Sequence, residues 1–431
     1  MAKQIGQKVL LLACILFATS GWSGLVQYTE KLHRVKIGFN IGYPNLIAEA
    51  QPALIKVIWL GITEIRVYEI FNGKEGEASY QKRLKAGLDI LIAYGVRPMI
   101  CISNFPLELI PTNDKQNELK QFLPKRNAKR IGKILSYSNR FPPENLQEYG
   151  IKIHNLIDFL FQHYGRTQVQ QWYFEIGNEP DAPLYFWGRP EQFEKLAKIA
   201  LEIFKRNGIA FAGGFGTTHN SVFSAEYKGK RSSIYHEVIR NFFYKKKFKG
   251  IFFSFHLYDR ERQVDLSDPL KGMPNWLSFL EQKKIITEWN VASQPRKANK
   301  IFSAPGVWGR GFIQLLIACH RDKIDTVYLF KLMDNKRFKS LQLGAFDVAG
   351  NPKRWFREFE EIWRVVRDGY TIEPLLHSTY LIHGTGKYSI ILAGKSMEII
   401  DSNLYQIDKS FVNSPTGTVA VGKWAILKRL R

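Results

Sequence analysis

Residues 171–206 read QWYFEIGNEPDAPLYFWGRPEQFEKLAKIALEIFKR, and this stretch contains one unit of the fold. Its opening, Gln171–Ile176, is a short apolar and aromatic run of the kind that forms a buried strand. A polar turn follows, and Pro190–Arg206 then repeats apolar residues at helical spacing. The stretch therefore predicts a strand, a loop and a helix that returns the chain to its starting end.

The same unit recurs along the chain. Eight β-rich runs alternate with eight helical stretches between residues 35 and 366. The predicted strands are Val35–Gly42, Ile62–Glu69, Val96–Ser103, Gln171–Ile176, Ile209–Gly214, Gly250–His256, Lys284–Glu288 and Asp325–Phe330. The predicted helices are Leu46–Leu60, Tyr80–Tyr94, Asn145–Tyr164, Pro190–Arg206, Ser233–Tyr244, Asn275–Gln282, Pro305–Arg321 and Lys353–Val366. Strict alternation predicts a parallel sheet, and eight repeats predict a closed (β/α)8, or TIM, barrel.

An open, doubly wound sheet is the competing α/β fold. It needs a phosphate loop near its first strand, and Ile37–Gly42 lacks the Gly-x-Gly-x-x-Gly spacing. The barrel is therefore expected to span residues 35–370. Short β runs between Gly, Asn and Pro turns follow, so residues 371–431 are expected to form a small β-rich accessory domain packed against the barrel.

Residues 1–20 have the pattern of an export signal. Two lysines precede the apolar run Val9–Ala18, and small residues follow it. The run is shorter than the ~20 residues that a membrane-spanning helix needs. A secretory signal peptide is the first interpretation, and a short uncleaved membrane anchor is the alternative. The protein is therefore expected in the periplasm or outside the cell, or anchored in a membrane and facing outward.

The chain is strongly basic, with 62 Lys and Arg against 39 Asp and Glu and a formal charge of +23. This charge favours polyanionic partners: nucleic acid, an anionic membrane or an acidic polysaccharide. Export and the lack of a recognisable binding motif argue against nucleic acid. Several segments after the predicted strands are rich in Lys and Arg, which favours a carbohydrate partner with acidic groups. A chain that is basic on all its faces is the alternative.

Two glutamates end strands that meet at one barrel mouth. Glu179 follows the fourth strand and Glu288 ends the seventh, while His256 and Tyr258 end the sixth. Paired carboxylates are what retaining glycoside hydrolysis requires: one donates a proton to the leaving oxygen and the other attacks the anomeric carbon. In such enzymes the two groups lie about 5–5.5 Å apart.

Arg66 is the expected partner of these carboxylates. Period-two alternation in the second strand places Glu64 and Arg66 on the face that points into the barrel. A buried guanidinium needs a carboxylate, and beside Glu288 it would keep a nucleophile ionised. The alternative is a core ion pair with Glu64 or Glu175. For Glu179, desolvation and the Glu288 charge predict a raised pKa.

Four segments resemble clan A glycoside hydrolases, most closely glycoside hydrolase family 39. They are Asn178–Asp181 (Asn-Glu-Pro-Asp), Ser254–Tyr258, Thr287–Asn290 and Gly344–Lys353. The resemblance spans roughly residues 35–366. That family includes β-xylosidases, α-L-iduronidases and bacterial exopolysaccharide endoglycosidases.

The resemblance implies a role for each matching residue. Glu179 is the implied acid/base and Glu288 the implied nucleophile. Asn178 is the implied contact to the sugar 2-hydroxyl, Tyr258 bonds the nucleophile, and His256 lines the same subsite. The chain departs from the family where Gly177 replaces the usual tryptophan, and where the eighth strand ends in Phe330 and Lys331.

The other expected substrate contacts are Arg66, Lys331 and the sugar-stacking rings of Trp187 and Trp289. No cofactor is expected, and no Cys-x-x-Cys pair or histidine spacing predicts a metal site. We therefore expect an exported retaining glycoside hydrolase acting on a poly- or oligosaccharide. The alternative is a catalytically idle carbohydrate-binding protein on the same barrel.

Overall fold

The computed structural model describes residues 32–429 apart from several segments. These are 69, 72–75, 121–139, 183–184, 224–230, 246–250, 259–267, 272, 292–303, 336–341, 376–378, 394–397, 400–404, 411–417 and 420–422. The predicted export segment, residues 1–20, lies outside the described residues. Among the residues that are described, no helix is long and apolar enough to cross a membrane.

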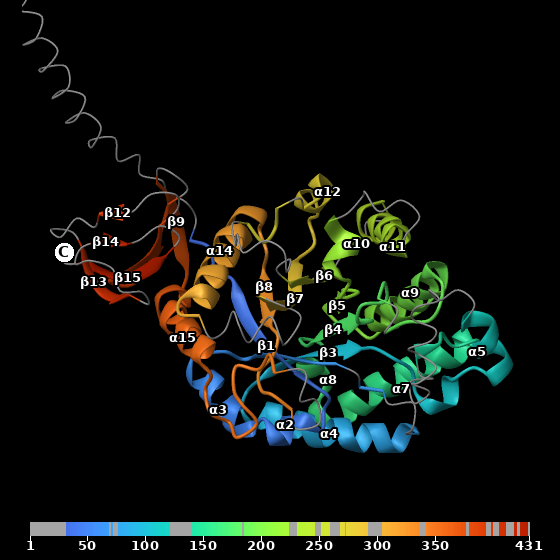
Figure 1. Ribbon diagram of the computed structural model, residues 1–431. Helices are drawn as coiled ribbons and strands as arrows, with labels where there is room; N and C mark the ends of the chain where they lie inside the picture. The colour runs from blue at the N-terminus through green and yellow to red at the C-terminus, as the bar shows by residue number, and fades with distance from the viewer. Residues whose placement is uncertain are drawn as a thin grey trace, which may run out of the picture. The chain divides into compact units, whose positions relative to one another are not determined.

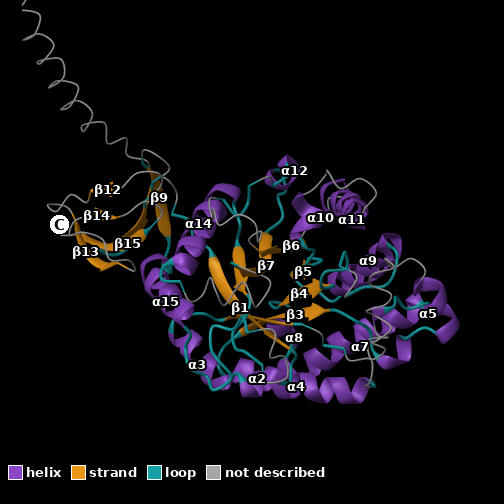
Figure 2. Cartoon of the chain, in the orientation of Figure 1, coloured by secondary structure: helices purple, strands orange, loops and turns teal. Residues whose placement is uncertain are grey.

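Eight parallel strands close into a barrel in chain order (Figures 1 and 2). They are β1 (Lys36–Gly42), β2 (Glu64–Val67), β3 (Arg97–Ile102), β4 (Tyr173–Ile176), β5 (Phe211–Gly213), β6 (Ile251–Tyr258), β7 (Lys284–Asn290) and β8 (Thr326–Leu329). Because β8 also pairs with β1, the sheet has no free edge. The predicted (β/α)8 barrel is confirmed.

Helices surround the strands (Figure 2). The helices that follow the strands are α2 (Leu46–Glu49), α3 (Gln51–Trp59), α4 (Glu77–Ala93), α7 (Leu146–Tyr164), α9 (Pro190–Arg206), α11 (Arg231–Arg240), α12 (Asn275–Ser278), α14 (Val307–Asp322) and α15 (Arg354–Val366). Short elements that the sequence did not predict are η1 (Leu107–Leu109), α5 (Asn113–Lys120), α8 (Arg166–Val169) and α10 (His219–Phe223). The helix predicted over Ser233–Tyr244 is α11 followed directly by the π-helical η3 (Asn241–Lys245).

The first predicted helix is two helices, α2 and α3, which meet at Ala50. Pro52 lies in the first turn of α3, where the missing N–H costs nothing, but its ring does not fit inside a continuous helix. The helix predicted over Asn275–Gln282 is also shorter than expected and ends at Ser278.

A layer of large side chains closes the barrel below the carboxyl ends of its strands. Its members are Met99, Tyr173, Phe252, Ile285 and Tyr328. Gly38 lets the Tyr328 ring pass against β1, because a Cβ at this position would lie 2.7 Å from that ring. The polar groups at the strand ends therefore stand on a packed floor rather than over an open channel.

The C-terminal sheet is antiparallel, in the order β13-β15-β11-β10-β9, beside the two-stranded pair β12-β14. Its strands are β9 (Tyr370–Pro374), β10 (Tyr380–Gly384), β11 (Tyr388–Leu392), β12 (Glu398–Ile399), β13 (Tyr405–Ser410), β14 (Thr418–Val419) and β15 (Trp424–Arg429). The indole of Trp424 donates to Gly306 O (2.9 Å), and a Cβ on Gly309 would lie 2.4 Å from its ring. One tryptophan thus packs the sheet against α14.

Trp424→Ala is expected to lower the free energy of unfolding by about 3–5 kcal/mol, because Trp424 is 1% exposed and the deletion leaves a cavity beside α14. Urea denaturation measures the change. Trp59→Ala is the control, since Trp59 is 84% exposed and the substitution should cost less than about 0.5 kcal/mol. Equal losses in the two variants would contradict the docking described here.

Candidate active site

Arg66 lies at the centre of the barrel mouth and is fully buried. Its guanidinium donates to Glu175 Oε2 (2.7 Å), Asn40 Oδ1 (2.8 Å), Glu288 Oε1 (3.0 Å) and Asn178 Oδ1 (2.7 Å). These acceptors come from β4, β1, β7 and the loop after β4. A single side chain therefore sets the spacing of polar groups from several strands.

The sequence offers three carboxylates as possible partners of Arg66. The structure pairs Arg66 with Glu288 and Glu175 and not with Glu64. Ion pairs join Arg66 to Glu175 (2.6 Å) and to Glu288 (3.0 Å), whereas Glu64 pairs with Arg97 at the starts of β2 and β3. Burial alone would lower the pKa of Arg66, but the two carboxylates hold it well above its usual range. The guanidinium is therefore a permanent buried cation.

Glu175 is the buried counter-charge of this cation. The Ser254 hydroxyl donates to its Oε1 (2.6 Å), and the Gly216 N–H donates to Ser254 Oγ (3.0 Å). Burial works against the ionised form of Glu175, but the charge of Arg66 and the hydrogen bonds from Ser254 and Arg66 lower its pKa. Glu175 is 0% exposed, so its charge supports the site from below and cannot reach a substrate.

Both carboxylate oxygens of Glu288 are held. The Tyr258 hydroxyl donates to Oε2 (2.5 Å), opposite the bond from Arg66 to Oε1. Burial and the Glu288 charge raise the pKa of Tyr258 well above its usual range, so Tyr258 remains a proton donor. The contact between Tyr258 and Glu288 is the one that the family resemblance implied.

The backbone of Glu179 is in the left-handed region, with φ +46°, directly after β4. A non-glycine residue there costs about 1–2 kcal/mol, and the N–H of Glu179 donates to Gly216 O (2.9 Å), which helps to hold it. Gly177 has φ +83°, and a Cβ there would lie 2.8 Å from the Phe193 ring. The family's usual tryptophan therefore does not fit this backbone at position 177.

The environment of Glu179 favours its neutral form. Burial and the negative charge of Asp181 raise its pKa to about 8, against the opposing charge of Arg66. The raised pKa agrees with the sequence prediction, but its electrostatic cause is Asp181 rather than Glu288. Asp181 is fixed by the Thr218 N–H (3.1 Å) and the Ser221 hydroxyl (2.6 Å), which donate to its carboxylate.

The two glutamates face one gap. One carboxylate oxygen from each, together with a ring nitrogen of His256, all lie within 4.8 Å of one another. His256 Nδ1 is hydrogen-bonded to Glu179 Oε1 (2.8 Å), and burial lowers the pKa of His256, which keeps the imidazole neutral. Two carboxylates and an imidazole could also bind a divalent cation, but the guanidinium of Arg66 beside Glu288 opposes a second positive charge there.

The remaining predicted contacts lie near this gap to different degrees. Asn178 accepts from Arg66 through its oxygen, so its NH2 group is the one left to donate to a ligand. Lys331 follows β8 and is 6% exposed, and burial lowers its pKa while Asp334 and Glu288 oppose the shift. The ring of Phe330 lies 6.1 Å from that of Tyr258, so the aromatic residue that ends β8 borders the site.

The two tryptophans predicted as sugar-stacking rings are both buried. Trp289 is 0% exposed and packs on Trp308 (5.4 Å between ring centroids), so its prediction as a sugar-stacking ring is wrong. Neighbouring residues in a strand point to opposite faces, and Glu288 already points inward. Trp187 is 4% exposed, and its ring packs edge-to-face with that of Phe141 (4.7 Å between ring centroids). Little of the Trp187 ring is therefore left to contact a ligand.

Two important residues were missed. Asn40 bridges Arg66 to the Thr287 carbonyl, to which it donates (2.9 Å), and a polar residue on the inward face of β1 is a signal that could have revealed it. Asp181 belongs to the motif quoted above, but its contacts with Thr218 and Ser221 join two loops and cannot be read from spacing.

Part of the chain is similar in sequence to a known glycosidase. A beta-xylosidase of Caldicellulosiruptor saccharolyticus is 30% identical over 121 residues, which are 28% of this chain and 21% of that protein. The chain thus matches about a fifth of the length of this curated relative. No protein-family model matches the chain.

Solved structures share the fold. A GH39 enzyme from Xanthomonas axonopodis pv. citri has a TM-score of 0.61 at 14% identity, covering 89% of this chain and 74% of that one. A monomeric beta-xylosidase from Caulobacter crescentus CB15 has a TM-score of 0.59 at 14% identity, covering 91% and 78%. The chain therefore resembles family 39 enzymes in its fold, and at this identity the solved structures show the fold alone.

Arg66→Met is expected to lower the free energy of unfolding by about 3–5 kcal/mol, because it leaves Glu175 buried without its cation. Adding Glu175→Gln should recover part of the loss by removing that charge. Urea denaturation at neutral pH measures both, with Arg206→Met, whose side chain is 78% exposed, as the control. A double variant no more stable than Arg66→Met would contradict the pairing.

Asp181→Asn is expected to lower the pKa of Glu179, because it removes a negative charge that raises it. A carbon-13 NMR titration of labelled glutamate measures this pKa, assigned by comparison with Glu179→Gln. Ser221→Ala is the matched control, since it removes one hydrogen bond and keeps the charge of Asp181. A titration of Glu179 that does not move in Asp181→Asn would contradict the assigned cause.

Proposed function

We propose that this protein is a glycoside hydrolase that cleaves O-glycosidic bonds of a poly- or oligosaccharide with retention of configuration. The observation that carries the proposal is the short gap between Glu179 and Glu288, whose oxygens lie within 4.8 Å. Retaining enzymes place their carboxyl groups about 5–5.5 Å apart, and inverting enzymes need about 6.5–9.5 Å to admit a water. The gap fits the first class.

The reaction proceeds in two displacements. In the first, the Glu288 carboxylate attacks the anomeric carbon, the bond to the glycosidic oxygen breaks, and Glu179 gives that oxygen its proton. In the second, the Glu179 carboxylate takes a proton from water, whose oxygen attacks the same carbon and releases Glu288. The raised pKa of Glu179, about 8, suits both roles, because the acid is protonated near neutral pH and its conjugate base is strong.

The similarity to a curated beta-xylosidase and the shared barrel of GH39 structures support this function. Since the match covers only 21% of that beta-xylosidase, the activity of this chain is our proposal. A carbohydrate-binding protein without catalysis is the alternative. It would not need the strained backbone of Glu179 or a neutral carboxyl beside a fixed carboxylate.

The first test uses activated aryl glycosides and follows the anomeric configuration of the first product by proton NMR. Wild type should give the retained anomer. Glu288→Gly should lose at least about 10⁴-fold in kcat, because it lacks the nucleophile, and azide should restore turnover with an inverted glycosyl azide. Glu202→Gln, on the exposed face of α9, should match wild type.

For wild type, kcat/KM should fall as the pH rises through about 8, because Glu179 loses the proton that it must donate. An inverted first product, or equal activity in wild type and Glu288→Gly, would contradict the proposed mechanism. Activity absent from wild type on a broad panel would favour the binding protein.

We further propose that the substrate carries acidic groups and that Lys331 recognises them. The ammonium is largely buried near Glu288, and within the described part of the chain no hydrogen bond or ion pair neutralises it. A carboxylate on the sugar would supply the missing partner. The basic segments that pointed to an acidic polymer lie largely outside the described residues and stay a prediction.

Lys331→Gln should lower kcat/KM for an aryl β-glucuronide by about tenfold and leave that for the matching β-xyloside within about twofold. The two rings differ only at C5, so the comparison isolates the carboxylate. Lys195→Gln, an exposed lysine on α9, is the charge-matched control. An equal loss on both substrates would contradict anion recognition by Lys331.

Export follows from the proposal that residues 1–20 are a signal or an anchor. Fractionation of cells that produce the full chain, with N-terminal sequencing of the product, tests it. A cleaved, periplasmic or secreted protein would support a signal, and an intact membrane-bound protein would support the anchor. An intact protein in the cytoplasm would contradict both.

A further inference from the structure

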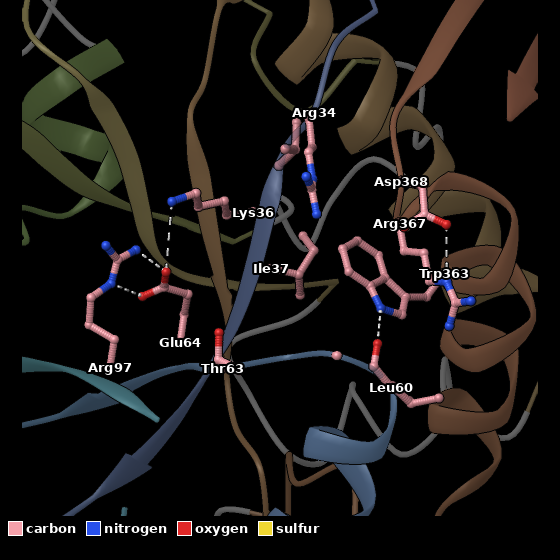
Figure 3. A pocket seen from close by; sticks show the side chains of 12 residues that line it. Arg34, Lys36, Ile37, Leu60, Thr63, Glu64, Arg97, Trp363, Arg367 and Asp368 are labelled. Carbon is pink, nitrogen blue, oxygen red and sulfur yellow. Dashed lines mark hydrogen bonds and ion pairs between the residues drawn. The ribbon is translucent and has the colours of Figure 1, made fainter. Parts of the chain in front are cut away.

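A second hollow lies at the end of the barrel opposite to Glu179 and Glu288. It has a volume of about 550 Å³ and is lined by the starts of β1, β2 and β3 and by the end of α15 (Figure 3). Parallel strands all begin at the same end of the barrel, whereas the catalytic glutamates follow the ends of β4 and β7. The hollow is therefore separate from the proposed active site.

Positive charge exceeds negative charge among the residues that line the hollow. The cations are Arg34, Lys36, Arg97 and Arg367, and the anions are Glu64 and Asp368. Figure 3 shows Lys36 and Arg97 both directed toward Glu64, and Arg367 beside Asp368.

Both carboxylates already have basic partners among the lining residues. Glu64 accepts from Arg97 Nε (3.1 Å) and lies 3.9 Å from Lys36 Nζ. Asp368 lies 3.4 Å from Arg367 Nε. Arg34 extends into the hollow in Figure 3, and it forms no ion pair with any residue that the structure describes. The four cations thus outnumber the two carboxylates by two.

The excess of positive charge affects the pKa of Lys36. Burial lowers its pKa, and the charge of Arg97 lowers it further, with Lys283 and Arg34 acting in the same direction. The charge of Glu64 acts in the opposite direction. A bound anion would relieve this repulsion, which is the electrostatic condition for an anion site.

We propose that this hollow binds a compact oxyanion, phosphate or sulfate, with Arg34 and Lys36 as its main ligands. The guanidinium provides a planar fork for two oxygens, and the ammonium provides a point charge. The volume is larger than one oxyanion and lies in the range of small-molecule sites, so the group can be carried by a sugar. The buried ring of Trp363 gives the hollow an apolar side, held by its bond to Leu60 O (3.0 Å).

Isothermal titration calorimetry at low ionic strength tests the site with three probes: inorganic phosphate, inorganic sulfate and glucose 6-phosphate. The full chain should bind at least one of them, and Arg34→Gln and Lys36→Gln should each weaken binding by about tenfold. Lys195→Gln should bind as wild type does. Tighter binding of glucose 6-phosphate than of phosphate would identify a sugar-borne group, and equal binding would identify the free ion; either supports the site.

Activity on a neutral aryl glycoside should be the same in all these proteins, since neither Arg34 nor Lys36 belongs to the active site. Circular dichroism confirms that the variants are folded. No binding by wild type at millimolar probe, or equal weakening in Lys195→Gln and in the two pocket variants, would overturn the proposal. This outcome is independent of whether Glu179 and Glu288 catalyse hydrolysis.

Discussion

A buried guanidinium is the constraint on which the rest of the site depends. Arg66 carries a permanent charge at a position with no exposed surface, and such a charge is tolerated only where carboxylates and further acceptors surround it. Glu175 supplies the structural counter-charge and Glu288 the reactive one. The same group also bonds Asn40 and Asn178, so the contacts that neutralise Arg66 also position polar groups of β1 and of the loop after β4.

The two glutamates proposed as catalytic are the same residue type in opposite environments. Glu288 lies between a guanidinium and a tyrosine hydroxyl, both of which donate to it. Glu179 lies near the negative charge of Asp181, on a loop whose backbone is strained. Their proposed division into nucleophile and acid therefore follows from their neighbours and not from their own chemistry. The strain at Glu179 is a local cost that the hydrogen bonds of the adjoining loops offset.

The sequence predicts the parts of this structure that follow from periodicity. Alternating strands and helices predicted the barrel, and period two placed Arg66 inside it. Because Glu288 points into the barrel, the same rule points its neighbour Trp289 away from the barrel interior. The prediction of Trp289 as a sugar-stacking ring therefore conflicted with this alternation, and the ring is buried. The loop contacts of Asp181 join segments that are 37 residues apart, and no local pattern reports such a contact. Pro52 was a sequence signal for the break between α2 and α3. Strands β9 and β13 were not recognised among the short β runs of the C-terminal region.

Retaining hydrolysis at this site requires Glu288 to become covalently bound to the sugar. Wild type should be incubated with an activated 2-deoxy-2-fluoro glycoside, which slows the second displacement, and then analysed by intact mass and peptide mapping. We predict a stoichiometric adduct of one glycosyl group on Glu288. An adduct on another carboxylate, such as Glu175, or steady hydrolysis of ordinary substrates with no adduct under any condition, would contradict it.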